Sequence, residues 1–358
     1  MIECEKVVRQ LAFFAAIEVD DEPSAADGLD VDSIAVEPTY DGPQLGKEMT
    51  QEFIDDMTER FKNGKTIHKK YVYQIVMAVK KLVYNEPTMV EVKIPEDVKL
   101  TVCGDTHGQY FDLMELFRIN GKPDDKNWYL FNGDFVDRGS WSTEIALLLY
   151  ANKWLRPNNF FINRGNHETD DMNRAYGFEG ECKAKYNERY AFPHQLLARY
   201  MRLIEDRTFK LFSESFSALP LATLIGEKFF VLHGGLFSDD NVTLDDIRKL
   251  DRHKQRQPGQ AGLMMEMLWT DPQTEPGRGP SKRGVGMQFG PDVTKRFCEK
   301  NGLEAIIRSH EVRMEGYEEE HDGKCITGTT PFLFVPDHIT FSLLTCHSQS
   351  SLLPSTAT

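Results

Sequence analysis

Three short polar clusters decide the fold of this chain: GDTHG at residues 104–108, GDFVDRG at 133–139 and RGNHE at 164–168. Each cluster directly follows an apolar run that is typical of a buried strand, at residues 98–103, 128–131 and 160–162. The polar side chains therefore begin where each predicted strand ends.

Segments with the apolar spacing of a helix separate these clusters. Leu113, Leu116 and Phe117 share one helical face, and Ile145, Leu148 and Leu149 share another. The order strand, loop, helix thus occurs three times, which predicts an α/β fold. Because the carboxyl ends of parallel strands meet in one crevice, we expect the three clusters to form one site.

The clusters carry residues that bind metal ions. Asp105 and His107 follow the first strand on a segment expected to be extended, and Asp134 and Asn166 follow the next two. Carboxylate and amide oxygens mixed with imidazole suit Mn, Fe or Zn better than Ca²⁺. A single Gly-Asp is usually an ordinary turn, but three such clusters with further ionisable residues favour a site.

The clusters resemble the signature motifs of the metal-dependent serine/threonine phosphoprotein phosphatases. Four later motifs agree with this resemblance: LHGG at 232–235, WTDP at 269–272, KRGV at 282–285 and RSHE at 308–311. Two more segments narrow it to one branch of the family: YGFEGE at 176–181 and VTLDDIRK at 242–249. The resemblance implies an α/β fold of the metallophosphoesterase type, with a central β-sandwich of mixed sheets flanked by helices.

The resemblance also implies two divalent metal ions, either Mn, Fe or Zn, with Mn the ion expected to serve in vitro. The first ion would be held by Asp105, His107 and Asp134. The second would be held by Asp134, Asn166, His233 and His310. A hydroxide activated by both ions would then attack the phosphorus atom of phosphoserine or phosphothreonine.

The remaining site residues implied by the resemblance act on the substrate. His167 would donate a proton to the leaving alkoxide, and Asp137 would hold His167 in its protonated form. Arg138 and Arg283 would bind the phosphate oxygens, because a guanidinium matches their geometry. Trp269 is expected to lie in the core or in a pocket wall. The other histidines are expected to be structural or at the surface: His68, His194, His253, His321, His338 and His347.

Composition narrows the partners. The net charge is −14, and residues 1–50 hold 12 Asp/Glu against 3 Lys/Arg. An acidic chain repels a phosphate backbone, so nucleic acid is not an expected partner. No apolar stretch is long enough to span a bilayer, so no membrane partner is expected either. Six cysteines without paired spacing suggest reduced thiols in an intracellular protein, and the resemblance implies cytoplasm and nucleus.

The first 49 residues are expected to form a short amphipathic helix over 1–17 and then an irregular, solvated acidic linker. In the matching branch of the family, such a linker follows an amino-terminal tetratricopeptide repeat domain. No 34-residue repeat is visible here, so we expect that domain to be missing and chaperone binding to be absent. Phosphoprotein substrates are then the expected partners.

Two helices should open the catalytic domain, which is expected to span 50–327. Thr50 is a suitable cap for the first, whose apolar face is formed by Phe53, Ile54, Met57 and Phe61. The second should run from His68 to Tyr84. Its buried positions are expected to be Tyr71, Val72, Ile75, Val76, Val79 and Leu82.

Two segments depart from the family pattern. Residues 189–206 are an 18-residue insert, which we interpret as translated non-coding sequence. Residues 328–358 form an atypical tail with one Asp and no Lys, Arg or Glu, typical of a wrong reading frame or a disordered end. We expect the fold to be incomplete at its C-terminus, with an open sheet edge and reduced stability.

The sequence therefore predicts a serine/threonine phosphatase. An alternative is a truncated, catalytically impaired or inactive relative that only binds metal or partners. A metallophosphoesterase acting on nucleotides or nucleic acid is disfavoured by the acidic charge and by the extended motif match.

Overall fold

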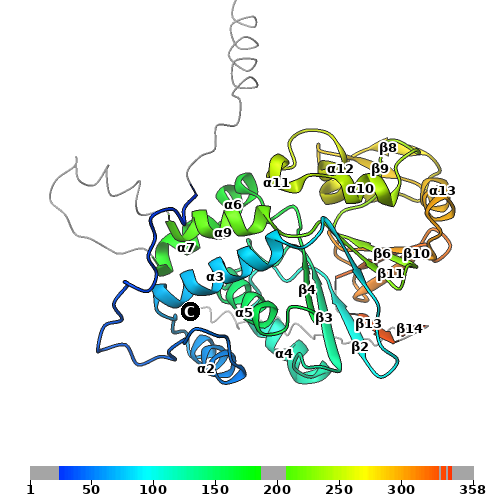
Figure 1. Ribbon diagram of the computed structural model, residues 1–358. Helices are drawn as coiled ribbons and strands as arrows, with labels where there is room; N and C mark the ends of the chain where they lie inside the picture. Colours follow the sequence, from blue (N-terminus) through cyan, green and yellow to red (C-terminus); the bar gives the residue numbers. More distant parts are fainter. Residues whose placement is uncertain (1–23, 187–206, 330–331, 336–337, 341–358) are drawn as a thin grey trace, which may run out of the picture.

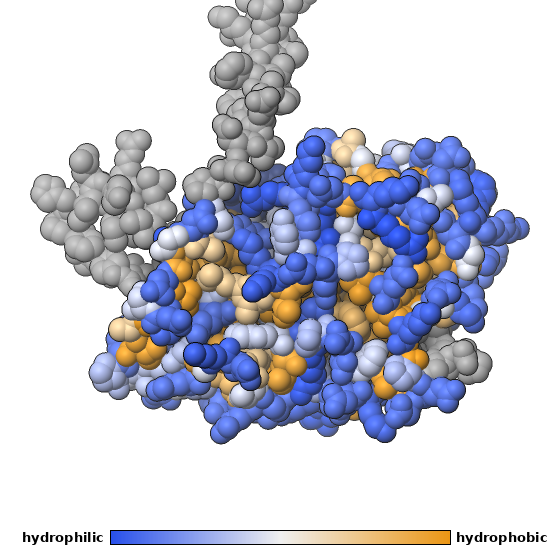
Figure 2. All heavy atoms as spheres, viewed as in Figure 1, coloured by the Kyte–Doolittle hydropathy of each residue, from blue (hydrophilic) through white to orange (hydrophobic). Residues whose placement is uncertain are grey.

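A computed structural model describes residues 24–186, 207–329, 332–335 and 338–340, the last two only as backbone (Figure 1). The expected helix at 1–17 and the insert at 189–206 lie outside these residues. No helix within the described ranges is long and apolar enough to cross a membrane. The face in Figure 2 is mainly hydrophilic, with apolar side chains showing between the helices.

Two mixed sheets form the centre of the fold. The five-stranded sheet has the order β14-β13-β2-β3-β4, and the six-stranded sheet has the order β1-β5-β6-β10-β12-β11. The strands of the first are β2 (Lys99–Cys103), β3 (Asn127–Asn132), β4 (Phe160–Asn163), β13 (Phe332–Val335) and β14 (His338–Thr340). The strands of the second are β1 (Met89–Val92), β5 (Ala222–Ile225), β6 (Phe229–Leu232), β10 (Ala305–Arg308), β11 (Tyr317–Glu320) and β12 (Cys325–Gly328).

Apolar side chains of both sheets meet between them. Val102 and Leu130 from the first sheet belong to one buried cluster with Val231 and Ile307 from the second. Burying these branched side chains on facing sheet surfaces is what holds a sandwich together. The predicted sandwich of mixed sheets is confirmed.

Helices cover the outer face of each sheet. The first group packs with the five-stranded sheet: α2 (Gln51–Lys62), α3 (Lys69–Tyr84), α4 (Tyr110–Asn120), α5 (Ser142–Leu155), α6 (Asp170–Tyr176), α7 (Phe178–Tyr186) and α9 (Arg207–Ser217). The second group lies on the other side (Figure 1): α10 (Leu244–Lys249), α11 (Arg252–Gln255), α12 (Leu263–Trp269) and α13 (Pro291–Asn301). A small third sheet, β7-β9-β8, lies with the second group: β7 (Asp271–Pro272), β8 (Arg278–Pro280) and β9 (Met287–Phe289).

The first two helices follow the predicted pattern closely. Thr50 caps α2 by accepting a hydrogen bond from the Phe53 N–H, and the four expected apolar residues are buried. His68 caps α3, which ends at Tyr84 as predicted. One predicted buried residue of α3 is not buried: Leu82 is partly exposed, and the neighbouring Val83 faces the core.

Residues 24–45, here called the strap, are irregular as expected but are not solvated throughout. Leu29, Val31, Ile34 and Val36 pack against the buried core beneath the helices. The expectation of a freely solvated linker is therefore wrong for this part. The apolar residues of the strap occur at intervals that fit neither a helix nor a strand, so periodicity could not reveal their burial.

The described part of the tail also differs from expectation. The β13 strand pairs antiparallel with β2, and β14 pairs with β13, so the edge of β2 is not open. Strand pairing requires extended backbone rather than alternating side chains, which is why the composition of the tail gave no sign of it.

Candidate metal centre

The six predicted ligand residues lie together at one edge of the sandwich. Three loops follow the parallel strands β2, β3 and β4, and two follow β6 and β10 of the other sheet. These five loops supply Asp105 and His107, Asp134, Asn166, His233 and His310, in that order. The expected convergence of strand ends therefore includes both sheets.

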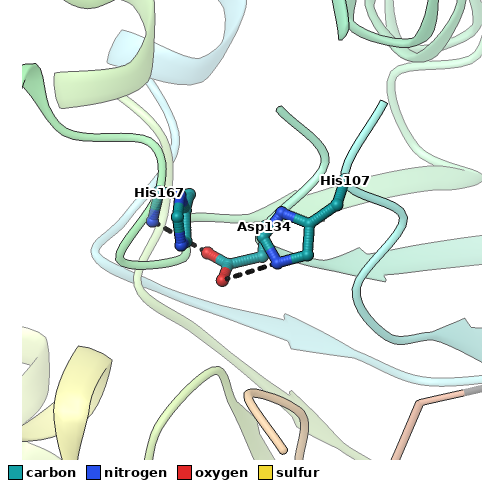
Figure 3. A group of neighbouring side chains, drawn as sticks. All are labelled: His107, Asp134 and His167. Atoms are coloured by element: carbon teal, nitrogen blue, oxygen red, sulfur yellow. Dashed lines mark hydrogen bonds and ion pairs between the residues drawn. The ribbon is translucent and has the colours of Figure 1, made fainter. Parts of the chain in front are cut away.

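Asp134 lies at the centre of the site. Its Oδ2 atom is 3.6 Å from Nε2 of His107 and 3.3 Å from Nε2 of His233. Two groups of potential ligand atoms share it, one with His107 and His167 and one with His233 and His310. Within each group the atoms lie within 4.8 Å of one another. Figure 3 shows the Asp134 carboxylate between the side chains of His107 and His167.

The other predicted ligands surround the same space. Asp105 Oδ2 lies 3.8 Å from Nε2 of His107, and Asp105 Oδ1 accepts a hydrogen bond from the His310 N–H at 3.2 Å. The end of the Asn166 amide that faces the site lies 2.9 Å from Nε2 of His233 and 3.0 Å from Nδ1 of His310.

The chemistry of this donor set fits divalent cations. The Asn166 amide contacts both Asp134 carboxylate oxygens and the ring nitrogens of His233 and His310, and Nε2 of His310 is buried with no hydrogen-bond partner among the described residues. A buried ring nitrogen without a partner is costly, and a cation at this position would satisfy it. Mixed carboxylate, amide and imidazole ligands are also those that divalent transition metals prefer.

The pKa values of the ligand residues show that the site concentrates negative charge. Burial and the nearby Asp134 charge raise the pKa of Asp105. Burial also opposes ionisation of Asp134, but the charges of His233 and His167 outweigh it and hold the pKa of Asp134 well below its usual value. Burial disfavours protonated His233, yet the Asp134 and Asp105 carboxylates raise its pKa to about 9. Without metal, protons would thus balance part of the negative charge.

The backbone of the site is held in uncommon conformations. Positive φ angles, which are rare outside glycine, occur at five predicted site residues: His107 (36°), Asp134 (51°), Asp137 (69°), Arg138 (66°) and His310 (73°). Such conformations cluster at functional sites. His107 lies in a turn rather than on the expected extended segment.

Close backbone contact explains two glycines. A Cβ atom on Gly133 would lie 2.4 Å from the Gly165 nitrogen, and a Cβ atom on Gly165 would lie 2.5 Å from the Asp134 nitrogen. Any larger residue would push the second and third clusters apart. The glycines therefore allow Asp134 and Asn166 to approach each other.

His167 and Asp137 form a buried pair. Nδ1 of His167 lies 2.8 Å from Oδ2 of Asp137, and the His167 N–H donates to Oδ1 of Asp134. Burial opposes protonation, but the Asp134 charge and the Asp137 hydrogen bond outweigh it, so the pKa of His167 is raised. Nε2, the second ring nitrogen, lies 3.3 Å from the Arg138 guanidinium.

The two predicted phosphate-binding arginines differ in their surroundings. Arg138 is exposed, with its guanidinium over the Tyr176 ring. Arg283 makes two contacts with the buried Asp271 carboxylate, at 2.6 and 3.2 Å, and donates to the His310 carbonyl at 3.0 Å. The fully buried Arg308 also donates to Asp271, at 2.8 Å to Oδ1.

Sequence reasoning gave no role to two residues that shape the site. Glu168 accepts hydrogen bonds from the backbone N–H groups of Asp134, Phe135 and Gly165 at 2.8 to 3.0 Å. It thus joins the second cluster to the third. Asp271 orients Arg283. Both residues lie in motifs noted in the sequence, RGNHE and WTDP, and this was the one sign in the sequence that they could shape the site.

The remaining histidines in the described residues lie away from the site or are engaged elsewhere. His68 caps α3 and pairs with Glu37, and His253 stacks on Tyr84. His321 contacts Thr294. Trp269 is partly buried and lies edge-on to His310 at 5.8 Å between ring centroids.

A sandwich of mixed sheets with such a donor set at its strand ends is the architecture of the metal-dependent phosphoesterases. The chain belongs to the calcineurin-like phosphoesterase family, whose family model matches residues 98–314. Members of this family use divalent metal ions, in agreement with the donor set described above.

Relatives support a narrower placement. Serine/threonine-protein phosphatase T of Aspergillus oryzae is 75% identical over 91% of this chain and 65% of its own length. Human serine/threonine-protein phosphatase 5 is 50% identical over 91% of this chain and 62% of its own. A solved Saccharomyces cerevisiae serine/threonine phosphatase, described as similar to human phosphatase PP5, has a TM-score of 0.73 and 48% identity over 81% of this chain and 90% of its own. The chain thus spans about two thirds or less of the curated relatives it matches.

One expectation from the sequence is overturned. A family model described as the PPP5 TPR repeat region matches residues 1–91, so the inference that this region is missing is wrong. The exclusion of chaperone binding, which depended on it, is wrong as well. Self-similarity is visible only between at least two copies of a repeat, and the described part of 1–91 contains one helix pair, α2 and α3.

Proposed function

We propose that this chain hydrolyses phosphoserine and phosphothreonine in proteins. One observation carries the proposal: the Asp134 carboxylate lies within ligand distance of His107 on one side and of His233 and His310 on the other, and the nearby His167 is paired with Asp137. The relatives' names as serine/threonine-protein phosphatases support this substrate class.

The residues of the site would hold two ions. Asp105, His107 and Asp134 would hold the first, and Asp134, Asn166, His233 and His310 the second. When bound, such ions polarise phosphoryl oxygens and lower the pKa of a water molecule to near neutrality. Mn, Fe and Zn all suit these ligands, and Mn is the ion we would add in an assay.

His167 would act as the general acid. An alkoxide from serine or threonine is a poor leaving group and requires a proton as its bond to phosphorus breaks. Asp137 binds Nδ1 of His167, which leaves Nε2 to deliver the proton. The raised pKa of His167 favours the protonated form that this role requires.

Arg138 and Arg283 would bind the phosphate. Arg283 is held by Asp271 and the His310 carbonyl, so its guanidinium is fixed before substrate arrives. A preorganised donor loses little entropy on binding and stabilises charge that develops on the phosphate oxygens. The exposed guanidinium of Arg138 lies over the Tyr176 ring and 3.3 Å from Nε2 of His167, and it would turn from His167 to the phosphate when substrate binds.

The test is hydrolysis of phosphoserine and phosphothreonine peptides with added Mn²⁺. We expect turnover by the wild-type protein and a loss of about 10²- to 10⁴-fold in His167→Ala, the usual contribution of a general acid. Asp134→Asn should lose both activity and bound metal.

Two surface variants are matched controls, His253→Ala and Asp245→Asn, and both should keep wild-type activity. If the wild-type protein binds two metal ions but leaves both peptides intact, a non-catalytic relative is the better description. If it cleaves nucleotide phosphoesters instead, the proposed substrate class is wrong.

A further inference from the structure

Asn173 touches both members of the His167–Asp137 pair. It lies on α6 with no exposed surface, 36 residues from Asp137 in sequence. Its Nδ2 donates to Oδ2 of Asp137 at 3.0 Å and to the His167 carbonyl at 2.6 Å. One amide group therefore connects the carboxylate and the backbone of the imidazole.

The hydrogen bonds around Asp137 leave its carboxylate little freedom to rotate. Oδ2 is shared by His167 Nδ1 and Asn173, while Oδ1 accepts the Phe178 N–H at 3.0 Å. The Asn173 amide is neutral, so it orients the Asp137 carboxylate without adding a charge to the site.

The orientation of the Asn173 amide is itself informative. Its Oδ1 is buried and has no hydrogen-bond partner among the described residues. Turning the amide over would point this oxygen at the Asp137 carboxylate and at the His167 carbonyl, which are both acceptors. The two donor contacts thus fix the amide, although its oxygen remains unsatisfied.

The helix that carries Asn173 is tied to both catalytic loops. Thr169 occupies the position before α6, where its carbonyl accepts the Asn173 N–H, and its hydroxyl donates to the Asn166 carbonyl at 2.6 Å. At the other end, the Tyr176 carbonyl accepts the Arg138 N–H at 3.1 Å. Asn173 therefore lies on a short support that spans the second and third clusters.

We propose that Asn173 is a positioning residue that keeps the His167–Asp137 pair aligned for proton donation to the leaving oxygen. The inference rests on the proposed function, because it assigns Asn173 to the general acid of that reaction. A small misalignment of a reacting group can cost about 10²-fold in rate. Loss of Asn173 should therefore affect proton donation more than substrate binding.

The test compares two leaving groups. A phosphothreonine peptide releases an alkoxide and needs the proton, whereas p-nitrophenyl phosphate releases a stabilised phenolate and needs it little. In Asn173→Ala we expect kcat to fall by roughly 10- to 10²-fold on the peptide, with KM nearly unchanged. On p-nitrophenyl phosphate, kcat should stay within about threefold of wild type, since that step depends weakly on a general acid.

A double-variant cycle separates positioning from general damage. If Asn173 acts through His167, the His167→Ala/Asn173→Ala protein should be no slower on the peptide than His167→Ala alone. Asn173→Leu, which has nearly the same size, covers the case in which Asn173→Ala folds poorly and should show the same contrast between substrates. Melting temperature and bound metal are measured for each variant.

Equal losses on both substrates, or additive losses in the double variant, would overturn the inference while leaving the proposed function intact. Wild-type activity of both Asn173 variants on the peptide would also overturn it. If the wild-type protein cleaves neither substrate, the proposed function fails and the role of Asn173 fails with it.

Discussion

The loops that follow β2, β3 and β4 and the strap at 24–45 are both irregular, acidic and rich in turns, yet they are held in opposite ways. In the loops, polar groups point inward, and Asp134, His167 and Asp137 are almost fully buried. In the strap, apolar residues such as Leu29 and Ile34 point inward, while most acidic side chains face solvent. The loops also contain His107, Arg138 and His167, whereas residues 24–45 contain no His, Lys or Arg, so only the loops offer an imidazole to a metal ion or a guanidinium to a phosphate.

The energetic consequence is a division of labour. Polar atoms that converge in a buried site repel one another without a ligand, so the loops lower the stability of the fold but are able to bind a ligand. The apolar side chains of the strap that pack against the core stabilise the fold without any ligand. Variants in the loops should therefore change metal binding and activity, and variants in the strap should change stability alone.

Removal of a buried ligand should give the largest effect. His233 has no exposed surface and lies 3.3 Å from Asp134 Oδ2. We expect His233→Ala to lower kcat/KM by about 10³-fold or more, because metal ions supply several kcal/mol of transition-state stabilisation. Bound metal, measured by mass spectrometry, should fall as well. A variant with full metal content and activity would remove His233 from the ligand set.

A smaller effect is expected where a side chain acts through a neighbour. Asp271→Asn weakens the hold on Arg283, so we expect kcat/KM to fall by roughly 10- to 10²-fold with unchanged metal content. The matched control is Asp240→Asn, since Asp240 pairs with Arg278 and Arg296 at the surface. If both variants lose the same activity, Asp271 has no special role in placing Arg283.

Much of the loop region could be predicted from sequence. Each ligand follows an apolar strand run, so Asp105, Asp134 and Asn166 were expected at one sheet edge, and β2, β3 and β4 confirm it. His233 and His310 were recognisable only with the other motifs, because a histidine after a strand is common. The role of Asn173 could not be predicted, since its contact with Asp137 depends on how α6 packs against the loop that follows β3.

The strap and tail show the limits of patterning. The partial burial of Leu29 and Ile34 follows from packing against a core cluster whose residues are distant in sequence, which no local period encodes. The pairing of β13 with β2 depends on backbone geometry rather than on residue type. Tertiary packing therefore decided these regions.

A strap variant should sharpen the contrast with the loops. The Tyr40 ring packs near Tyr71 and His68 and lies under the Arg60 guanidinium at 4.9 Å. We expect Tyr40→Ala to lower the free energy of unfolding by about 1–3 kcal/mol, the usual range for losing partly buried aromatic contacts. The kcat of the folded enzyme should not change. Urea denaturation checks the first expectation, with the exposed Glu48→Ala as control, and a large loss of kcat would contradict the second.

The smallest expected effect is a loosening of the strap in acid. Hydrogen bonds from Lys65 and Arg60 lower the pKa of Asp41 from 3.8 to about 2. Glu214 accepts a hydrogen bond from the Ala25 N–H of the strap. Burial opposes ionisation of Glu214, but its hydrogen bond from Lys80 outweighs burial, so the pKa of Glu214 is lowered. A carboxyl whose pKa is depressed by folding stabilises the fold above its unfolded pKa and loses that contribution as the pH falls through the folded value. Protection of the 24–45 amides from hydrogen exchange should therefore decline below about pH 4.5. Asp41→Asn, which cannot ionise, should weaken this protection at neutral pH and show a smaller further decline in acid. Identical pH profiles for the variant and the wild type would show that the apolar anchors alone hold the strap.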